Sequence, residues 1–92
     1  MTLREIITEV GRKYGLSFRE MIDLYRDAPR GLARNEAYWR CRAETGHTTV
    51  TIARVFRRNH STIIKGSQRH DWRLHRTPYA QLRAFAAALP AP

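Results

Sequence analysis

The stretch TTVTIARVFRRNHSTII, residues 48–64, decides the fold. Apolar residues recur at helical spacing over 50–56, and Thr48 or Thr49 is placed to cap this helix. Asn59 is a good cap for a second helix, which begins about three residues after the first one ends. A joint this short forces the two helices to cross steeply, which predicts a helix-turn-helix.

The sequence before this motif carries further start and stop signals for helices. Residues 2–5 (TLRE) and 17–20 (SFRE) both have the capping-box form, in which a hydroxyl and a carboxylate satisfy free backbone donors. Gly15 and Gly46 are expected to end the first and third helices. The segment 27–31 (DAPRG) is expected to separate the second helix from the third.

The whole chain is therefore expected to be an all-α bundle of about six short helices. The β-branched residues 48–52 could form a strand instead, but the chain offers no partner strand. Buried positions are expected at Tyr25 in the second helix and at Ile63, Ile64 and Trp72 in the fifth. The predicted helices cover residues 3–14, 18–25, 32–45, 49–56, 60–75 and 78–89, with 90–92 frayed.

Length and composition fit one domain over residues 1–92. The single cysteine, Cys41, can form no internal disulfide, so nothing indicates secretion. The N-terminus has no signal-peptide pattern, and no apolar run approaches the roughly 18 residues of a membrane span. We therefore expect a cytoplasmic protein that is not associated with a membrane.

Positive charge is concentrated in the second half of the chain. The net charge is +9 in total. Residues 1–44 hold nine Lys and Arg against seven Asp and Glu, whereas residues 45–92 hold eight against one. Such clustering is typical of polyanion binding, whereas a surface that serves solubility has no need of it.

The start of the second helix of the motif carries short polar side chains suited to base edges. A recognition helix enters the major groove with its N-terminal residues against the bases. Asn59 could pair bidentately with adenine, while Ser61 and Thr62 could donate to or accept from several bases. The ring of His60 or the methyl group of Thr62 could contact a thymine methyl group. Capping by Asn59 does not exclude these contacts.

Two basic groups surround these four residues. Arg54, Arg57 and Arg58 flank the turn, and further cations recur at spacings of three or four along the fifth helix, where they could follow a phosphate backbone. These further cations are Lys65, Arg69, Arg73 and Arg76. A second group, Arg26, Arg30 and Arg34, could reach an adjacent minor groove, or could be an ordinary solvated loop.

Other function classes are less well supported by the sequence. There is no Cys-x-x-Cys pair, His-Glu-x-x-His motif or nucleophile motif, so we predict no enzymatic activity, metal or cofactor. RNA readers usually offer aromatic platforms on a sheet, which this chain lacks. The alternative is a protein-interaction module with non-specific DNA affinity, in which Trp39, Trp72 or the last helix docks RNA polymerase or another regulator.

Several segments together are similar to one known family. These segments are residues 3–7 and 14–17, Ala33-Arg34, Thr45-Gly46, Ile52, Phe56, and His60-Ser61-Thr62-Ile63. The last of them is similar to the family signature Asp-His-(Ser/Thr)-Thr-Val. Over about residues 3–76 the chain resembles the C-terminal DNA-binding domain of the bacterial chromosomal replication initiator DnaA.

The resemblance implies a helix-turn-helix that binds double-stranded DNA. It implies that Asn59, His60 and Ser61 contact bases in the major groove and that Thr62 contacts a base or a phosphate. The other residues that it implies on DNA are Arg26 in the minor groove, Arg34 and Arg42 at basic positions, and the backbone near Thr48, Thr49 and Val50.

The chain departs from the family pattern at three places. Asn59 replaces an acidic residue that can only accept hydrogen bonds, so the preferred base there is expected to differ. Arg57-Arg58 replaces a Gly-Gly-Arg turn and is one residue shorter, and Glu44 stands where the family has an apolar residue. The DNA-box sequence of the family is therefore not carried over.

No Walker-type glycine loop occurs in the 92 residues, so no nucleotide cofactor is predicted. The chain could recognise a DNA site, but it offers no evident means of opening a duplex. We expect a regulator of transcription or replication, phage-derived or part of a larger protein, rather than a complete initiator.

Overall fold

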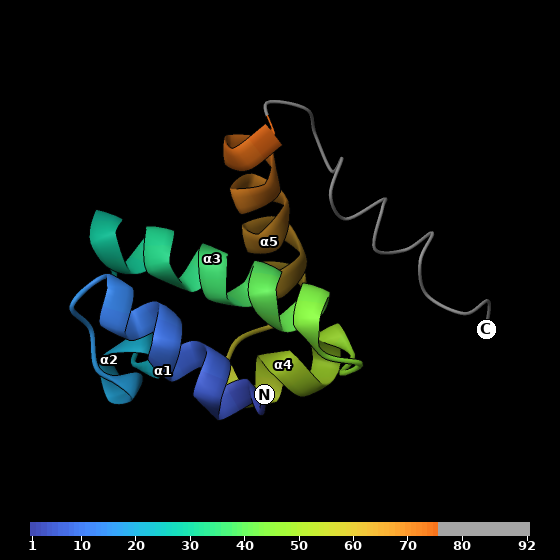
Figure 1. Ribbon diagram of the computed structural model, residues 1–92, viewed down its shortest axis with the longest axis horizontal. Helices are drawn as coiled ribbons and strands as arrows, with labels where there is room; N and C mark the ends of the chain where they lie inside the picture. Colours follow the sequence, from blue (N-terminus) through green and yellow to red (C-terminus); the bar gives the residue numbers. More distant parts are fainter. Residues whose placement is uncertain (76–92) are drawn as a thin grey trace.

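The computed structural model describes residues 1–75, which form five α-helices (Figure 1). The helices are α1 (Leu3–Lys13), α2 (Phe18–Ile22), α3 (Ala28–Glu44), α4 (Thr49–Phe56) and α5 (His60–His75). The predicted all-α class is confirmed for this part of the chain, and residues 48–52 belong to a helix and its cap instead of a strand. The predicted last helix lies outside the described residues.

The helix starts follow the capping signals of the sequence. In α1 the Thr2 hydroxyl accepts from the Glu5 N–H while the Glu5 carboxylate accepts from the Thr2 N–H, at 3.1 and 2.8 Å. Ser17 and Glu20 repeat this reciprocal pair at the start of α2. Gly15 follows α1 with φ of +72°, as expected for a residue that ends a helix in the left-handed region.

The core lies between α3 and the helices that cover it. Figure 1 shows α3 lying across the molecule, with α1 beside it and α5 crossing it steeply. Ring packing of Tyr38 edge-on against Phe56, with centroids 4.7 Å apart, joins α3 to α4. The buried apolar residues are Leu3, Ile6, Ile7, Val10, Met21, Ala33, Ala37, Tyr38, Cys41, Ile52, Ala53, Phe56 and Ile63.

The crossing of α3 and α5 depends on Gly66. A Cβ atom added there would lie 2.5 Å from both Asn35 Oδ1 and Tyr38 Cδ2, a distance that side chains do not tolerate. Glycine therefore lets the backbone of α5 approach α3 closely.

Several helix ends and buried positions differ from the expectations. Helix α3 begins at Ala28 and not at Leu32, because Asp27 caps it through the Arg30 N–H, and a proline in the first turn has no helical hydrogen bond to lose. Helix α2 ends at Ile22, so Tyr25 lies in a loop and is 63% exposed. Trp72 is 46% exposed. Ile64 is half-buried, whereas Ile63 is buried as expected.

The end of α3 differs from the expectation as well. Thr45, in extended conformation, is its C-cap, and Gly46 does not adopt a positive φ. The Thr45 hydroxyl donates to the Cys41 carbonyl at 2.7 Å and accepts from the His47 N–H, which closes the end of the helix without glycine.

Candidate nucleic-acid interface

The turn between α4 and α5 is tight because Arg57 adopts the left-handed conformation, with φ of 56° and ψ of 43°. Its N–H and that of Arg58 donate back to the Arg54 and Ala53 carbonyls at 3.2 and 3.0 Å. These bonds end α4 in one turn of backbone without a glycine. The shorter Arg57-Arg58 turn therefore still joins the two helices of the predicted helix-turn-helix.

Asn59 caps α5, as the sequence predicts. Its Oδ1 accepts from both the N–H and the hydroxyl of Ser61, each at 2.9 Å, and its carbonyl accepts from the Thr62 N–H. Asn59, His60, Ser61 and Thr62 are all exposed. The four polar residues predicted to contact bases therefore lie together at the surface, at the free end of the second helix of the motif.

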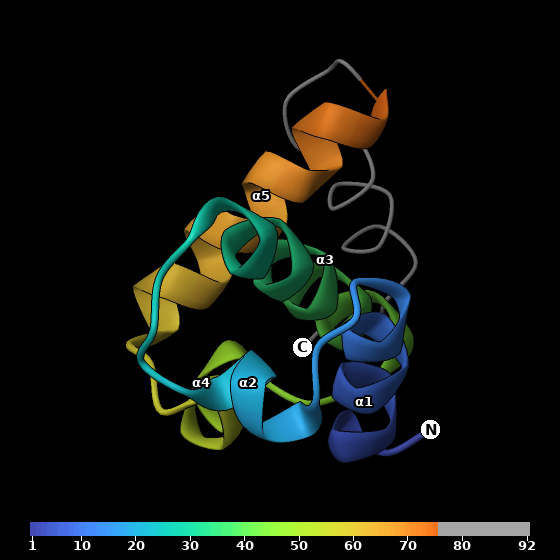
Figure 2. The ribbon, with the colours of Figure 1, turned by 90° about the vertical axis from the view of Figure 1, so that its left-hand side faces the viewer.

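A groove of about 350 Å³ lies beside these residues, between α5 and the segment that joins α2 to α3. Figure 2 shows this segment passing the first turns of α5. Three exposed side chains that line the groove carry positive charge: Arg26 from the segment, and Lys65 and Arg69 from α5. Thr62 lines it too. The groove therefore brings Arg26 from one basic group together with Lys65 and Arg69 from the other at one concave surface, whose lining also includes one acid, the α3 cap Asp27.

Arg34 also lines the groove, but its guanidinium is directed into the fold. It is 5% exposed, and its guanidinium donates to the backbone carbonyls of Glu20, Met21, Asp23 and Tyr25 at 2.6 to 2.9 Å. It also pairs with the Asp23 carboxylate at 2.7 Å. These contacts hold the segment after α2 in place, so the structure gives Arg34 a structural role and we do not retain it among the proposed DNA contacts.

Arg30 and Arg58 also bind the segment after α2. The Arg30 guanidinium pairs with the carboxylates of Asp23, Glu20 and Asp27 at 2.9, 3.2 and 3.5 Å. The half-buried Arg58 donates to the backbone carbonyls of Asp23 and Phe56. Acidic side chains and carbonyls thus already compensate these two guanidinium groups, unlike that of Arg57, which is exposed.

Arg42 and Arg73 do not line the groove. The partly buried Arg42 donates to the Ser67 hydroxyl at 2.8 Å and so links α3 to α5. Arg73 lines a different hollow with Lys13 and Tyr14. The expected stripe of cations along α5 therefore divides: Lys65 and Arg69 line the groove, Arg73 does not, and Arg76 lies outside the described residues.

The start of α4 offers a second contact point. The Thr48 hydroxyl accepts from the Thr51 N–H at 3.2 Å, and the Thr48 carbonyl accepts from the Ile52 N–H at 3.0 Å. In the first turn of a helix, the N–H groups of Thr49 and Val50 have no intrahelical acceptor. Thr48 and Val50 are exposed and Thr49 is half-buried, so an external anion could reach this backbone.

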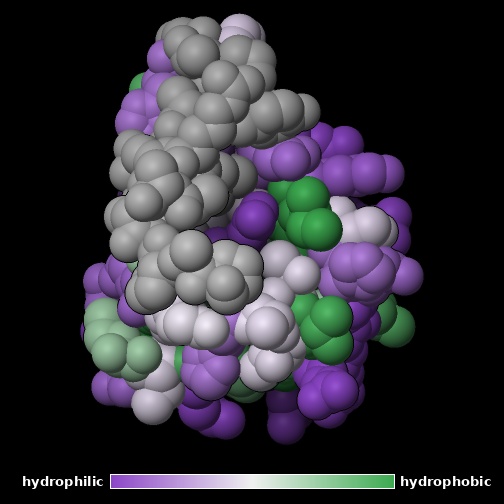
Figure 3. Space-filling view, turned by 90° about the vertical axis from the view of Figure 1, so that its right-hand side faces the viewer, coloured by the Kyte–Doolittle hydropathy of each residue, from purple (hydrophilic) through white to green (hydrophobic). Residues whose placement is uncertain are grey.

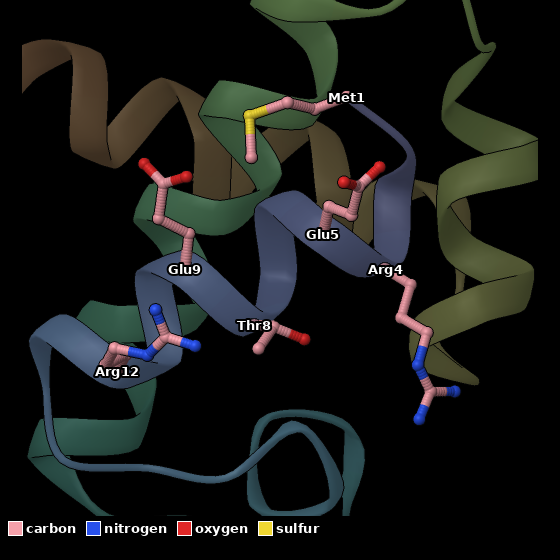
Figure 4. Close-up of a pocket in the computed structure, with 6 residues that line it drawn as sticks. All are labelled: Met1, Arg4, Glu5, Thr8, Glu9 and Arg12. Atoms are coloured by element: carbon pink, nitrogen blue, oxygen red, sulfur yellow. The ribbon is translucent and has the colours of Figure 1, made fainter.

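Another hollow lies along the outer side of α1, and it has a mixed electrostatic character. Its lining includes Arg4 and Arg12 but also Glu5 and Glu9, as Figure 4 shows. Glu5 belongs to the capping box, and Glu9 accepts from Arg40 at 3.0 Å. Two carboxylates make this surface a poor match for a polyanion.

A cluster of ionisable groups that the sequence did not predict lies where α1, α3 and α5 meet. Glu36 accepts from the Tyr14 hydroxyl at 2.8 Å and from Lys13 Nζ at 3.0 Å. Burial raises the pKa of Glu36, but these hydrogen bonds outweigh it and hold the pKa below its usual value. His70 is 6% exposed, burial lowers its pKa, and its Nδ1 finds no hydrogen-bond partner among residues 1–75. A signal was present, because His70 follows the buried Ile63 at helical spacing.

Groups able to support catalysis or metal binding are sparse in the described part of the chain. Burial raises the pKa of the Cys41 thiol to about 12, which keeps it protonated near neutral pH. Residues 1–75 contain no group of three or more His, Cys, Asp or Glu side chains that could hold a metal ion. Within the same residues, no helix is long and apolar enough to cross a membrane.

In the part of the surface that Figure 3 draws in colour, the exposed apolar side chains form no single broad patch. Hydrophobic residues appear there as separate patches between hydrophilic ones. The large apolar residues exposed in the described chain are Met1, Leu24, Tyr25, Leu32, Val50, Trp72 and Leu74. Trp39 is half-buried, and its indole N–H donates to Asp71 at 3.1 Å.

Comparison with protein families gives a match over residues 3–69 to the bacterial DnaA protein helix-turn-helix. The chain belongs to this family. Comparison with curated proteins and with solved structures finds no match. Membership makes the chain a DNA-binding helix-turn-helix protein whose partner is double-stranded DNA, and the match spans α1 to the middle of α5.

Proposed function

We propose that the chain recognises particular double-stranded DNA sites, with the first turn of α5 in the major groove and the α2–α3 segment over the adjacent minor groove. The observation that carries this proposal is the cationic groove, where Arg26, Lys65 and Arg69 flank the exposed polar start of α5. Cations that contact phosphates give affinity and fix the register of the helix. Asn59, His60, Ser61 and Thr62 then contact base edges.

The proposed contacts divide by task. Base contacts come from the start of α5, and Arg26 enters the minor groove, where a narrow A·T-rich segment attracts a guanidinium. Phosphate contacts come from the start of α4, from the turn and from α5. The phosphate-contacting groups are the backbone of Thr49 and Val50, and the side chains of Arg57, Lys65 and Arg69.

The biological role that we propose is a regulator of transcription or replication that acts on the bacterial chromosome in the cytoplasm. The 92 residues carry no glycine-rich phosphate-binding loop. We therefore assign them the recognition of a site and not the opening of a duplex.

The test begins with selection of bound duplexes from a random pool, followed by affinity measurements on the selected and a scrambled duplex. His60→Ala should lower affinity for the selected duplex by about 1–3 kcal/mol and leave the scrambled one nearly unchanged. Arg69→Ala should weaken both alike and reduce the salt dependence.

Arg12→Ala is the matched control, because it removes the same charge from the outer side of α1. It should change neither affinity nor specificity. Equal losses on both duplexes for His60→Ala would contradict base contact by this residue. Absence of salt-dependent binding to any duplex would contradict the proposal itself and favour a protein-interaction module.

A further inference from the structure

The amide of Asn59 has one orientation in this structure, and hydrogen bonding fixes it. Two groups of Ser61, the backbone N–H and the hydroxyl, converge on a single atom of this amide at 2.9 Å. A backbone N–H can only donate, so the atom that it meets must be an acceptor. That atom is the amide oxygen, and Nδ2 is the remaining polar atom of the side chain.

The capping contact therefore leaves Asn59 with donors alone. Nδ2 carries two N–H groups and no lone pair for a hydrogen bond, and the residue is exposed. Bidentate pairing with adenine needs the amide oxygen to accept from N6 while the amide nitrogen donates to N7. With its oxygen held by Ser61, Asn59 lacks this combination, and the pairing with adenine that the sequence suggested would require the cap to open.

Ser61, by contrast, keeps an acceptor and no free donor on its side chain. Its hydroxyl hydrogen is donated to Asn59, at 2.9 Å between the two oxygens. A hydroxyl that donates its single hydrogen keeps its lone pairs and can still accept. Asn59 and Ser61 together present one donor group and one acceptor group at the start of α5.

We propose that Asn59 selects guanine in the major groove and that Ser61 accepts from the amino group of a cytosine or an adenine. This inference rests on the proposed function. Guanine presents two acceptors, N7 and O6, whereas cytosine presents an amino donor that would face the donors of Asn59. Adenine presents an amino donor beside N7, and thymine offers O4 beside a methyl group, so guanine fits the Asn59 amino group best.

Two substitutions of Asn59 change its hydrogen-bonding groups but keep its capping role. Asn59→Asp keeps a good N-cap but offers only acceptors, so its preference should reverse to cytosine. Asn59→Ser also keeps a good N-cap, and it removes the amide donors. Thermal melting of both variants should therefore match that of the parent chain closely, which shows that any change in DNA binding is not a loss of folding.

The experiment uses the selected duplex with each position changed in turn to the other three base pairs. At one position the parent chain should prefer guanine to cytosine on the same strand by about 10-fold, and Asn59→Asp should prefer cytosine. Asn59→Ser should bind both with similar affinity. Preferences at positions distant from this one should be shared by all three proteins.

Two results would overturn the inference while leaving specific DNA binding intact. One is a parent preference for adenine or cytosine at the position that responds to residue 59. The other is an unchanged guanine preference in Asn59→Asp. If the parent chain does not distinguish the selected duplex from a scrambled one, the proposed function fails and this inference fails with it.

Discussion

Arginines of two kinds lie within a short distance of one another around the α2–α3 segment. Arg34 is almost completely buried and holds four backbone carbonyls. Arg26, eight residues earlier, is exposed and lines the cationic groove. One arginine therefore stabilises the segment, whereas the other presents its positive charge to a ligand.

The difference lies in what each guanidinium already binds. A buried guanidinium is stable only when its donors are satisfied, and the last turn of α2 and the loop after it supply carbonyls that no helix uses. Arg30 and Arg58 add further bonds to this loop. This inner set of arginines, Arg30, Arg34 and Arg58, thus holds Arg26 beside α5. Arg26 belongs to an outer set, the exposed cations of the groove. The number of positive charges along the sequence does not distinguish the two sets.

The largest effect is expected on stability, when an arginine of the inner set is replaced. Arg34→Met keeps a long aliphatic chain but leaves four backbone carbonyls without their donor. Leaving such groups unsatisfied should lower the free energy of unfolding by about 3 kcal/mol or more, measured by urea denaturation. Arg12→Met, at an exposed position, should stay within about 0.5 kcal/mol of the parent. A parental denaturation midpoint for Arg34→Met would contradict the division into two sets.

Removing cations of the outer set should change DNA binding and leave stability nearly unchanged. Lys65→Ala combined with Arg69→Ala should leave stability within about 1 kcal/mol, because both side chains are exposed. The slope of log affinity against log salt should become less steep by about 2, one for each lost phosphate contact. Affinity measured from low to high salt checks this. An unchanged slope would remove both residues from the interface.

For Arg26 we expect a smaller effect on affinity, which depends on the base pairs that flank the site. Arg26→Ala should reduce affinity for a site flanked by A·T pairs more than for the same core flanked by G·C pairs, because a narrow minor groove attracts the guanidinium. Paired duplexes that differ only in the flank measure this directly. Equal loss on both duplexes would place Arg26 on a phosphate and not in the minor groove.

The smallest effect is expected from His70, which lies inside the fold near Glu36, Lys13 and Arg73. Burial lowers the pKa of His70, so the unfolded chain takes up its proton first as the pH falls. The free energy of unfolding should therefore decrease as the pH falls below about 6.5. His70→Gln should lose this dependence between pH 7.5 and 5.5 in urea denaturation. A decrease of equal size in His70→Gln would assign the effect to other groups.

Local signals predicted much of the fold because their partners are close in sequence. Both capping boxes, the left-handed Gly15 and the cap of α5 by Asn59 connect residues within a few positions of one another. The start of α3 was misplaced because a proline after Asp27 was interpreted as a break, although a first turn accommodates it.

The candidate site was harder to predict than the helices. The exposed start of α5 follows from its position in the motif. The role of Arg34 does not, because its acceptors are carbonyls of a segment 9 to 14 residues away whose path depends on the tertiary structure. The buried cluster around Glu36 joins α1 to α3 across more than 20 residues, which no local pattern indicates.

The most direct test of the central claim is a titration of the isotope-labelled chain with the selected duplex, followed by NMR. Chemical shifts should change at Arg26, at the start of α4, and from Asn59 to Arg69, while Thr8 and Arg12 on the outer side of α1 stay unchanged. Changes concentrated on α1 or at the end of α5, with the cationic groove unaffected, would contradict the account.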